Sequence, residues 1–259
     1  MKGFTLEVCA NSVQSAINAQ IAGAKRIELC ENLFIGGTTP SYGCIKTTRE
    51  RVDIAINILI RPRIGDFLYS DIEFEQIKND ILVAKQLGVN GIVCGILLPN
   101  GEVDTERTAE LVELSKPLTF TFHRAFDFTP DPHKALEDII KTGATHILTS
   151  GQKNKAADSV DLLCEFVKKA ANRIAIMPGS GINANTIKRI VNTGANEFHM
   201  SGVKDVESKM IYRKENLTLN GNSLPDYVNQ ISDVESIKMV IEYRSEEHTS
   251  ELQSRSDLV

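Results

Sequence analysis

One junction recurs four times along this chain and constrains its fold more than any other feature. Each copy places a glycine at the end of a helix-like stretch and begins a strand-like run two or three residues later. Glycine adopts the left-handed backbone conformation that ends helices at little steric cost. Four copies indicate a repeated helix–strand architecture rather than two unlike domains. The copies are Gly23-Ala24-Lys25-Arg26-Ile27, Gly88-Val89-Asn90-Gly91-Ile92, Gly143-Ala144-Thr145-His146-Ile147 and Gly194-Ala195-Asn196-Glu197-Phe198.

Eight β-rich runs alternate with helix-period stretches, and they follow one another at intervals of about 20 to 35 residues. This pattern predicts an α/β protein, a (β/α)8 TIM barrel that forms a single domain over residues 1–243. A doubly wound open sheet is the alternative, but it usually has a glycine-rich turn after its first strand, where this chain reads Ala10-Asn11-Ser12. The predicted strands are Phe4–Ala10, Arg26–Glu31, Ile56–Pro62, Gly91–Leu97, Leu118–Phe126, Thr145–Gly151, Arg173–Pro178 and Asn196–Gly202.

The last part of the chain departs from this alternation. Val203–Gln230 is polar and predicts a loop, and Ser232-Asp233 predicts the start of a final helix from Ile231 to about Tyr243. The remaining residues, 244–259, look like the translation of a sequencing-adapter oligonucleotide. We therefore interpret residues 244–259 as a non-native, disordered tail and give its His248 no functional role.

Charge and cysteine content exclude several classes of protein. The chain has 29 Lys and Arg against 34 Asp and Glu, a formal charge of −5, and no basic cluster, so we expect no nucleic-acid or membrane partner. No apolar run approaches the roughly 18 residues that span a bilayer, and no signal-peptide pattern precedes the first strand. Five cysteines without a CxxC motif predict reduced thiols. We therefore expect a cytoplasmic protein.

Side-chain alternation predicts a polar lumen. In a barrel strand, successive side chains face the outer helices and the interior in turn, and the apolar residues fix which is which. This places Glu7, Glu28 and Glu197 inside, where each carboxylate costs several kcal/mol unless it is paired, metal-bound or protonated. One interpretation is an internal ion network in which the carboxylates contact Arg61 and two histidines.

The second interpretation is a functional site. Inward residues near the C-terminal ends of their strands lie on the face where barrel enzymes carry out their chemistry, and this position favours a site over a purely structural network. The candidate catalytic residues are Glu7, Glu28, Arg61, His123 and His199.

Two Glu-x-Cys motifs lie at the same depth on neighbouring strands, Glu7-Val8-Cys9 and Glu28-Leu29-Cys30. Adjacent strands are about 4.8 Å apart, so the thiols of Cys9 and Cys30 could bind a soft ion such as Cu(I) in two-coordinate geometry. Barrel stagger could instead separate them. A second interpretation is that both cysteines are reduced core residues without a ligand. A third is that Cys9 is a nucleophile activated by a histidine.

A glycine-rich turn follows the seventh predicted strand, at Gly179-Ser180-Gly181, and we expect a helix to begin directly after it at Asn183. Backbone N–H groups at a helix N-terminus bind anions, and many barrels bind phosphate in this region. The turn therefore predicts an anion site formed by Gly179, Ser180 and Gly181.

With these residues in view, the chain resembles the CutC family of copper homeostasis proteins from about Phe4 to Tyr243. One difference is Ile64, where the family often has glycine. The resemblance implies a TIM barrel, a cytoplasmic location, homodimers or homotetramers, a role in copper handling, and Cys9 and Cys30 as Cu(I) ligands. It rests on Leu6-Glu7-Val8-Cys9, Arg26-Ile27-Glu28-Leu29-Cys30, Gly36-Gly37-Thr38-Thr39-Pro40-Ser41, Ile60-Arg61-Pro62-Arg63, Gly65-Asp66-Phe67-Leu68-Tyr69-Ser70, Thr121-Phe122-His123-Arg124-Ala125-Phe126-Asp127, Ile147-Leu148-Thr149-Ser150-Gly151-Gln152 and Ile176-Met177-Pro178-Gly179.

Two hypotheses follow. The first is a cytoplasmic copper homeostasis protein that binds Cu(I) through Cys9 and Cys30 near the barrel mouth. The alternative is a lyase, isomerase or hydrolase that acts on a small phosphorylated or carboxylated metabolite, with anion binding at Arg61 and the Gly179 turn and acid–base chemistry at the inward carboxylates and histidines.

Overall fold

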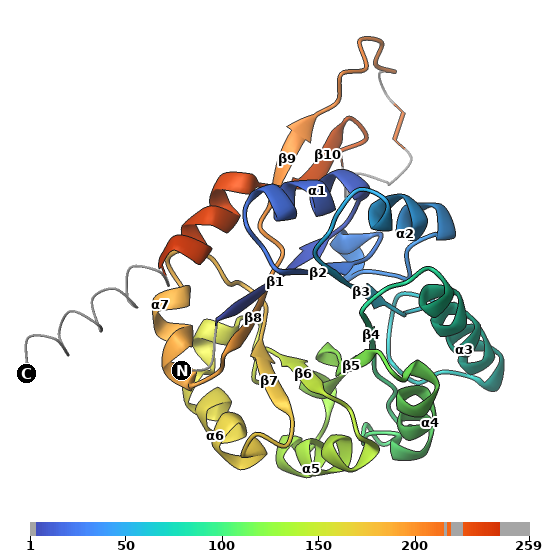
Figure 1. Ribbon diagram of the computed structural model, residues 1–259, viewed down its shortest axis with the longest axis vertical. Coiled ribbons are helices and arrows are strands. Elements are labelled where there is room, and N and C mark those ends of the chain that lie inside the picture. The colour runs from blue at the N-terminus through green and yellow to red at the C-terminus, as the bar shows by residue number, and fades with distance from the viewer. Residues whose placement is uncertain (1–3, 215–216, 219–224, 244–259) are drawn as a thin grey trace, which may run out of the picture.

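Eight parallel strands form the centre of the computed structural model, and helices surround them (Figure 1). The structure describes residues 4–214, 217–218 and 225–243, so the predicted tail, 244–259, lies outside the described residues. The sheet runs in the order β7-β6-β5-β4-β3-β2-β1-β8, and a parallel bridge between Gly179 and His199 closes it. The predicted TIM barrel is confirmed. Its strands are β1 Thr5–Ala10, β2 Arg26–Leu29, β3 Ala55–Leu59, β4 Gly91–Cys94, β5 Thr119–Phe122, β6 His146–Thr149, β7 Ala175–Pro178 and β8 Glu197–Met200.

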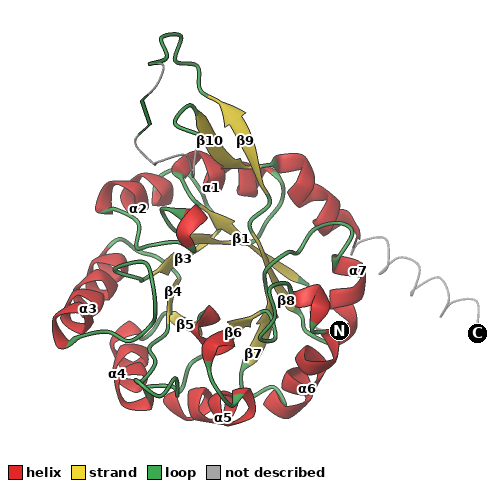
Figure 2. Ribbon diagram, turned by 180° about the vertical axis from the view of Figure 1, so that it is seen from behind, coloured by secondary structure: helices red, strands yellow, loops and turns green. Residues whose placement is uncertain are grey.

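The helices form an outer ring, which Figure 2 shows from behind. Side-chain caps fix the starts of two of these helices: Ser70 and Glu73 form a capping box on α3, and the Asp131 side chain accepts the first N–H groups of α5. No helix among the described residues is long and apolar enough to cross a membrane. The helices are α1 Val13–Ile21, α2 Tyr42–Arg49, α3 Asp71–Gln86, α4 Thr105–Ser115, α5 Pro132–Thr142, α6 Val160–Ala170, α7 Ile187–Ile190 and a last helix at 234–243.

The repeated glycine junction has the predicted conformation at all four positions. Gly23, Gly88, Gly143 and Gly194 have φ angles between 73° and 93°, the left-handed region that L side chains rarely adopt. Each glycine therefore ends its helical segment and directs the chain into the next strand of the barrel.

Two predictions about the last third of the chain are wrong. The segment predicted as a loop, Val203–Gln230, contains β9 (Val203–Glu207), which pairs antiparallel with β10 (Val228–Ser232) in an arm that projects from the ring (Figure 1). Ser232 ends β10, so the last helix begins at 234 with Asp233 as its cap, since the Asp233 carboxylate accepts the Ser236 N–H. Polar composition concealed these strands because neither has a buried apolar face.

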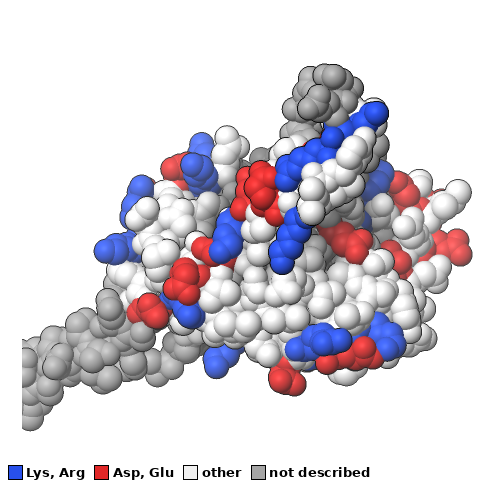
Figure 3. All heavy atoms as spheres, turned by 90° about the horizontal axis from the view of Figure 1, so that it is seen from above, with Lys and Arg blue, Asp and Glu red and all other residues white. Residues whose placement is uncertain are grey.

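The strands alternate as predicted. Large apolar side chains such as Ile27, Ile56 and Phe198 pack between the sheet and the helices in the main core. A second, small buried cluster consists of Cys9, Cys30, Leu59 and Val93, which face the lumen. On the face shown in Figure 3, basic and acidic side chains are interspersed rather than gathered into a field of one sign.

Candidate functional site

A cavity of about 520 Å³ opens at the C-terminal ends of the strands. This volume is within the usual range of small-molecule sites. Most of the predicted site residues line it, whereas Glu7, Cys30 and Gly179 do not, and Glu7 and Cys30 are fully buried. The predicted residues that line it are Cys9, Glu28, Arg61, His123, Ser180, Gly181 and His199.

The two predicted metal ligands lie together at the floor of this cavity. The Sγ atoms of Cys9 and Cys30 are 3.6 Å apart, and both side chains are buried. With metal–sulfur bonds of about 2.3 Å, two sulfurs at this separation would subtend about 100° at a shared ion, whereas a linear arrangement needs about 4.6 Å. The separation therefore does not suit linear coordination by the two sulfurs alone, which two-coordinate binding predicts. A bent S–metal–S arrangement suits it better and leaves space for a third ligand.

Two further side chains lie within reach of the Cys9 thiol. Glu28 and His199 each bring one ligand atom within 4.8 Å of the Cys9 sulfur and of each other. The three residues together could hold a metal ion. The Cys9 thiol also donates to Glu28 Oε1 at 3.8 Å. The hydrogen bond between Cys9 and Cys30, together with burial of the Cys9 side chain, raises the pKa of Cys9 well above its usual range. Cys9 is therefore a neutral thiol until a metal displaces its proton.

The carboxylate of Glu7 orients the His199 ring. Its Nδ1 lies 2.9 Å from Glu7 Oε1, which leaves Nε2 as the nitrogen that Glu7 does not engage. Burial opposes the charged imidazole, but the Glu28 and Glu7 carboxylates raise the pKa of His199. A histidine held by a carboxylate is the arrangement that fixes metal-binding imidazoles in one tautomer and orientation.

Glu7 itself is fully buried and fully engaged. It accepts hydrogen bonds from Arg26 Nε at 2.6 Å and Asn57 Nδ2 at 2.8 Å in addition to its contact with His199. Burial would raise its pKa, but the His199 hydrogen bond and the Arg26 charge hold the pKa of Glu7 at about 2. Glu7 is therefore a permanent carboxylate that positions His199.

Sequence reasoning missed Arg26 and His146. Arg26 joins Glu7 to Glu197, whose Oε2 accepts from Arg26 Nη2 at 2.6 Å, and His146 Nε2 lies 3.4 Å from the same oxygen. The alternation that turned Glu28 and Cys30 inward also turns Arg26 inward, so the signal was present. The predicted network of inward carboxylates exists and includes His199, but the predictions of Arg61 as its cation and of His123 as its second histidine are wrong.

Arg61 instead holds two loops at the mouth. Its Nη1 donates to the carbonyl oxygens of Ile35 and Gly37, and its Nη2 donates to that of Gly65, all at 2.9–3.0 Å. Arg61 is buried, and no carboxylate pairs with it among the described residues. Its charge is therefore stabilised by carbonyl dipoles and by the Phe67 ring, whose centroid lies 5.4 Å from Arg61 Cζ.

Glu28 and His123 are buried, and each keeps an atom without a partner. Burial raises the pKa of Glu28 to about 7, and its Oε2 has no hydrogen bond in the structure. Burial and the Arg61 charge lower the pKa of His123 to about 3. His123 Nδ1 accepts the Ala125 N–H at 3.2 Å, so the neutral ring carries its proton on Nε2, which has no partner.

The glycine turn after β7 does not open a helix, so that part of the anion-site prediction is wrong. α7 begins only at Ile187, and Asn183 instead caps a turn by accepting the N–H groups of Asn185 and Thr186. Ser180 Oγ donates to the Asn154 carbonyl, and Gly179 forms the bridge that closes the barrel. Anion binding at Gly179, Ser180 and Gly181 stays a prediction.

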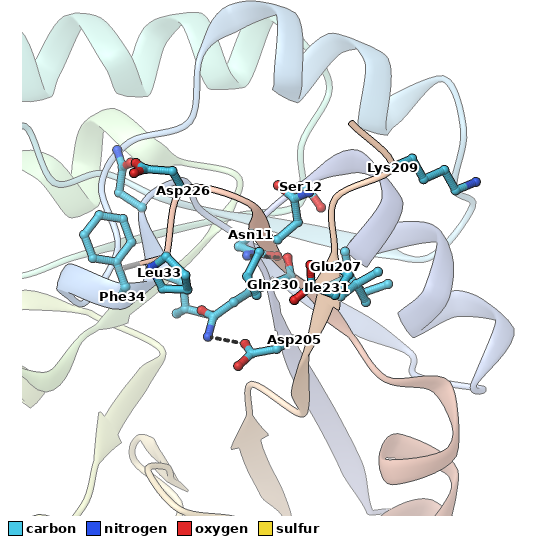
Figure 4. A pocket seen from close by; sticks show the side chains of 15 residues that line it. Asn11, Ser12, Leu33, Phe34, Asp205, Glu207, Lys209, Asp226, Gln230 and Ile231 are labelled. Carbon is cyan, nitrogen blue, oxygen red and sulfur yellow. Dashed lines mark hydrogen bonds between the residues drawn. The ribbon is translucent and has the colours of Figure 1, made fainter. Parts of the chain in front are cut away.

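A larger cavity, about 960 Å³, lies between the β9–β10 arm and the loops after β1 and β2 (Figure 4). It contains none of the predicted site residues. Gln230 Nε2 donates to Asp205 within the arm, and Asn11 Nδ2 donates to the Gln230 carbonyl. Leu33 borders both cavities.

Comparisons with known proteins support the resemblance that the sequence suggested. The model of the CutC family matches residues 4–204. A CutC family protein from Parabacteroides distasonis is 45% identical over 239 residues, 91% of this chain and 98% of the relative. The copper homeostasis protein cutC homolog of Mus musculus is 43% identical, covering 91% and 88%. A solved CutC structure from Streptococcus agalactiae superposes with a TM-score of 0.72 at 36% identity, covering 76% and 98%.

Proposed function

The chain belongs to the CutC family, and from that premise we propose that it acts in copper homeostasis by binding one Cu(I) ion through Cys9 and Cys30 at the mouth of the barrel. The relatives named as copper homeostasis proteins support the process. The thiol pair, with Sγ atoms 3.6 Å apart at the floor of an open cavity, is the single observation that carries the chemistry.

Thiolate is the protein ligand that best selects Cu(I) over harder ions. The bent angle implied by the thiol separation leaves a third coordination position, and His199 is the neighbour best prepared to fill it because Glu7 orients its ring. Glu28 lies equally close, but its pKa of about 7 makes it a weaker candidate near neutral pH.

The residues around the ion would have distinct tasks. Cys9 and Cys30 bind it, His199 completes the coordination, and Glu7 holds His199. Arg26 and Asn57 in turn hold Glu7 as a charged, immobile carboxylate. The buried charges of the lumen are therefore support for a thiolate site rather than acid–base catalysts.

A cytoplasmic location and a homodimeric or homotetrameric assembly are further parts of the proposal. A reducing compartment keeps the thiol pair free to bind metal, whereas an oxidising one would favour its conversion to a disulfide. Light scattering on the purified protein tests the assembly, and a monomer at micromolar concentration would contradict it.

The enzyme alternative has less support in the geometry. Glu7, one of the candidate catalytic residues, is saturated by three partners. On the loop after β6, backbone N–H groups that could bind a phosphate already donate to the Asp127 carboxylate. We therefore do not propose catalysis.

Competition for Cu(I) against a colorimetric chelator tests the proposal. The wild-type protein should withdraw one equivalent of copper, and Cys9→Ser with Cys30→Ser should withdraw none. Cys44→Ser with Cys164→Ser is the matched control, because these two thiols lie outside the cavity and should not contribute. Equal copper uptake by the Cys9/Cys30 variant and the wild type would refute the assignment.

A further inference from the structure

The cavity above the thiol pair has a second set of polar groups, which copper binding does not use. His123 is 5% exposed and lines the cavity, and its Nε2 carries a proton without an acceptor. A buried donor left unpaired has a free-energy cost for the folded protein. An acceptor supplied from outside the chain would remove that cost.

Positive charge lies beside this donor. Arg61 is 6% exposed, lines the same cavity, and contacts loop carbonyls and the Phe67 ring but no carboxylate among the described residues. Arg124 also lines the cavity, but Asp127 neutralises it through a contact of 2.8 Å. Among the described residues that line the cavity, the single acidic side chain is Glu28. The part of the cavity around Arg61 and His123 therefore carries one cation that no anion of the chain balances.

The charge indicates what kind of group would bind. One unbalanced cation together with one neutral N–H donor suits a singly charged carboxylate, which can accept both. A phosphate carries more charge and needs more donors than Arg61 and His123 offer together. A carboxylate is therefore preferred to a phosphate.

The apolar side chains that cover the cavity indicate the chemistry of the ligand beyond its carboxylate. Phe67 packs on His123 at 4.9 Å between ring centroids and on Phe128 at 5.5 Å. Phe67 and Phe128 both line the cavity, and Phe128 is 68% exposed. Large apolar side chains gathered around one opening are typical of binding sites. An aromatic or branched apolar group would cover them.

The geometry points to a binding site for a small apolar monocarboxylate in the barrel mouth, with the carboxylate at Arg61 and His123 and the apolar group against Phe67 and Phe128. The site lies beside Cys9 but shares no proposed ligand with the copper ion. The carboxylate site can therefore be tested independently of copper binding. Its ligand would enter past Phe128 and displace the Phe67 ring from His123.

A tryptophan reporter tests this site directly. The chain has no tryptophan, so Phe128→Trp introduces a single one at the mouth. Titration with 3-phenylpropanoate should give a saturable fluorescence change, and the uncharged 3-phenylpropanamide should bind at least about tenfold more weakly. In the same background, His123→Asn should weaken the carboxylate by about tenfold, since Asn can still accept the Ala125 N–H but lacks the Nε2 donor.

Two controls keep the result interpretable. Ile21→Trp places the reporter on an exposed residue at the far end of α1, outside the cavity, and should not respond. Thermal unfolding of the wild-type protein provides a second readout, because a ligand of the folded state raises the melting temperature. The carboxylate should raise it and the amide should not.

The site is refuted by any of three results. The first is no saturable response to 3-phenylpropanoate in either readout. The second is equal binding of acid and amide, which would show that charge has no role. The third is tighter binding of phenyl phosphate than of the carboxylate.

Discussion

Cys9 and Cys30 bring their Sγ atoms to 3.6 Å although they are not register partners, since Cys9 pairs with Glu28 across β1 and β2. The thiols meet diagonally because both side chains turn into the narrow lumen. Glu28 of β2 and His199 of β8 both lie beside Cys9, with one ligand atom of each residue within 4.8 Å of the others. The metal site that we propose therefore uses three neighbouring strands of the barrel.

Removal of His199 or of its support should weaken copper binding. His199→Gln deletes the third ligand, and Glu7→Gln replaces the carboxylate that orients the ring. We expect losses of about 10- to 100-fold in Cu(I) affinity by chelator competition for each. His133→Gln, at an exposed position on α5, is the control. Unchanged affinity in both variants would leave His199 without a role in coordination.

Arg26 should be more important for stability than a surface arginine. Arg26→Met leaves the buried Glu7 carboxylate without its cation, which costs about 3–5 kcal/mol when one partner of a buried pair is removed. Arg173→Met breaks an exposed pair with Glu137 and should change the free energy of unfolding far less. Urea denaturation measures both. Similar losses in the two variants would argue against a special role for the lumen pair.

Gly37 should be intolerant of any side chain. Its φ is +84°, and a Cβ there would lie 2.6 Å from Leu59 Cδ2 and 3.4 Å from Cys30 Cβ. Gly37→Ala should therefore destabilise the fold by about 1–3 kcal/mol and weaken copper binding through Cys30. Gly43→Ala, in α2 with nothing within 4 Å, should leave both unchanged or add a little stability. A well-tolerated Gly37→Ala would contradict the packing described here.

The pH dependence of stability should include a contribution from His123. Its pKa is about 3 in the folded protein against 6.5 for an ordinary histidine, so the unfolded chain binds the proton first as pH falls. This contribution is complete above pH 6.5 and is lost between pH 6.5 and 3, by an amount on the order of a few kcal/mol. Glu28, with its raised pKa of about 7, changes stability in the opposite direction between pH 4.5 and 7.

Comparison of the His123→Asn variant with the wild type separates the His123 contribution to stability from the Glu28 contribution. His123→Asn should flatten the loss of stability between pH 6.5 and 3 relative to the wild type, when unfolding is followed by circular dichroism. An identical pH profile in the two proteins would mean that His123 is not held neutral in the folded state.

Much of this architecture is readable from the sequence. Glycines such as Gly23 and Gly143 reveal the helix–strand repeat, because few residues can adopt their conformation, and alternation correctly turns Glu7 and Cys9 inward. The β9–β10 arm was missed because its strands bury no apolar face, which is the feature that sequence patterns detect.

The site was only partly predictable for a different reason. Strand alternation says which way a side chain faces but not which partner it meets across the lumen. Arg61 and Arg26 both face inward, yet Arg61 reaches loop carbonyls at the mouth and Arg26 reaches Glu7 at the other end. Only the three-dimensional register distinguishes them.

The coordination of the bound metal tests the central claim most directly. X-ray absorption at the copper edge of the protein loaded with one equivalent of Cu(I) should show two sulfur ligands and one nitrogen or oxygen ligand. The His199→Gln protein should lose the imidazole signature and keep both sulfurs. A spectrum with fewer than two sulfur ligands, or one unchanged by Cys9→Ser with Cys30→Ser, would contradict the account.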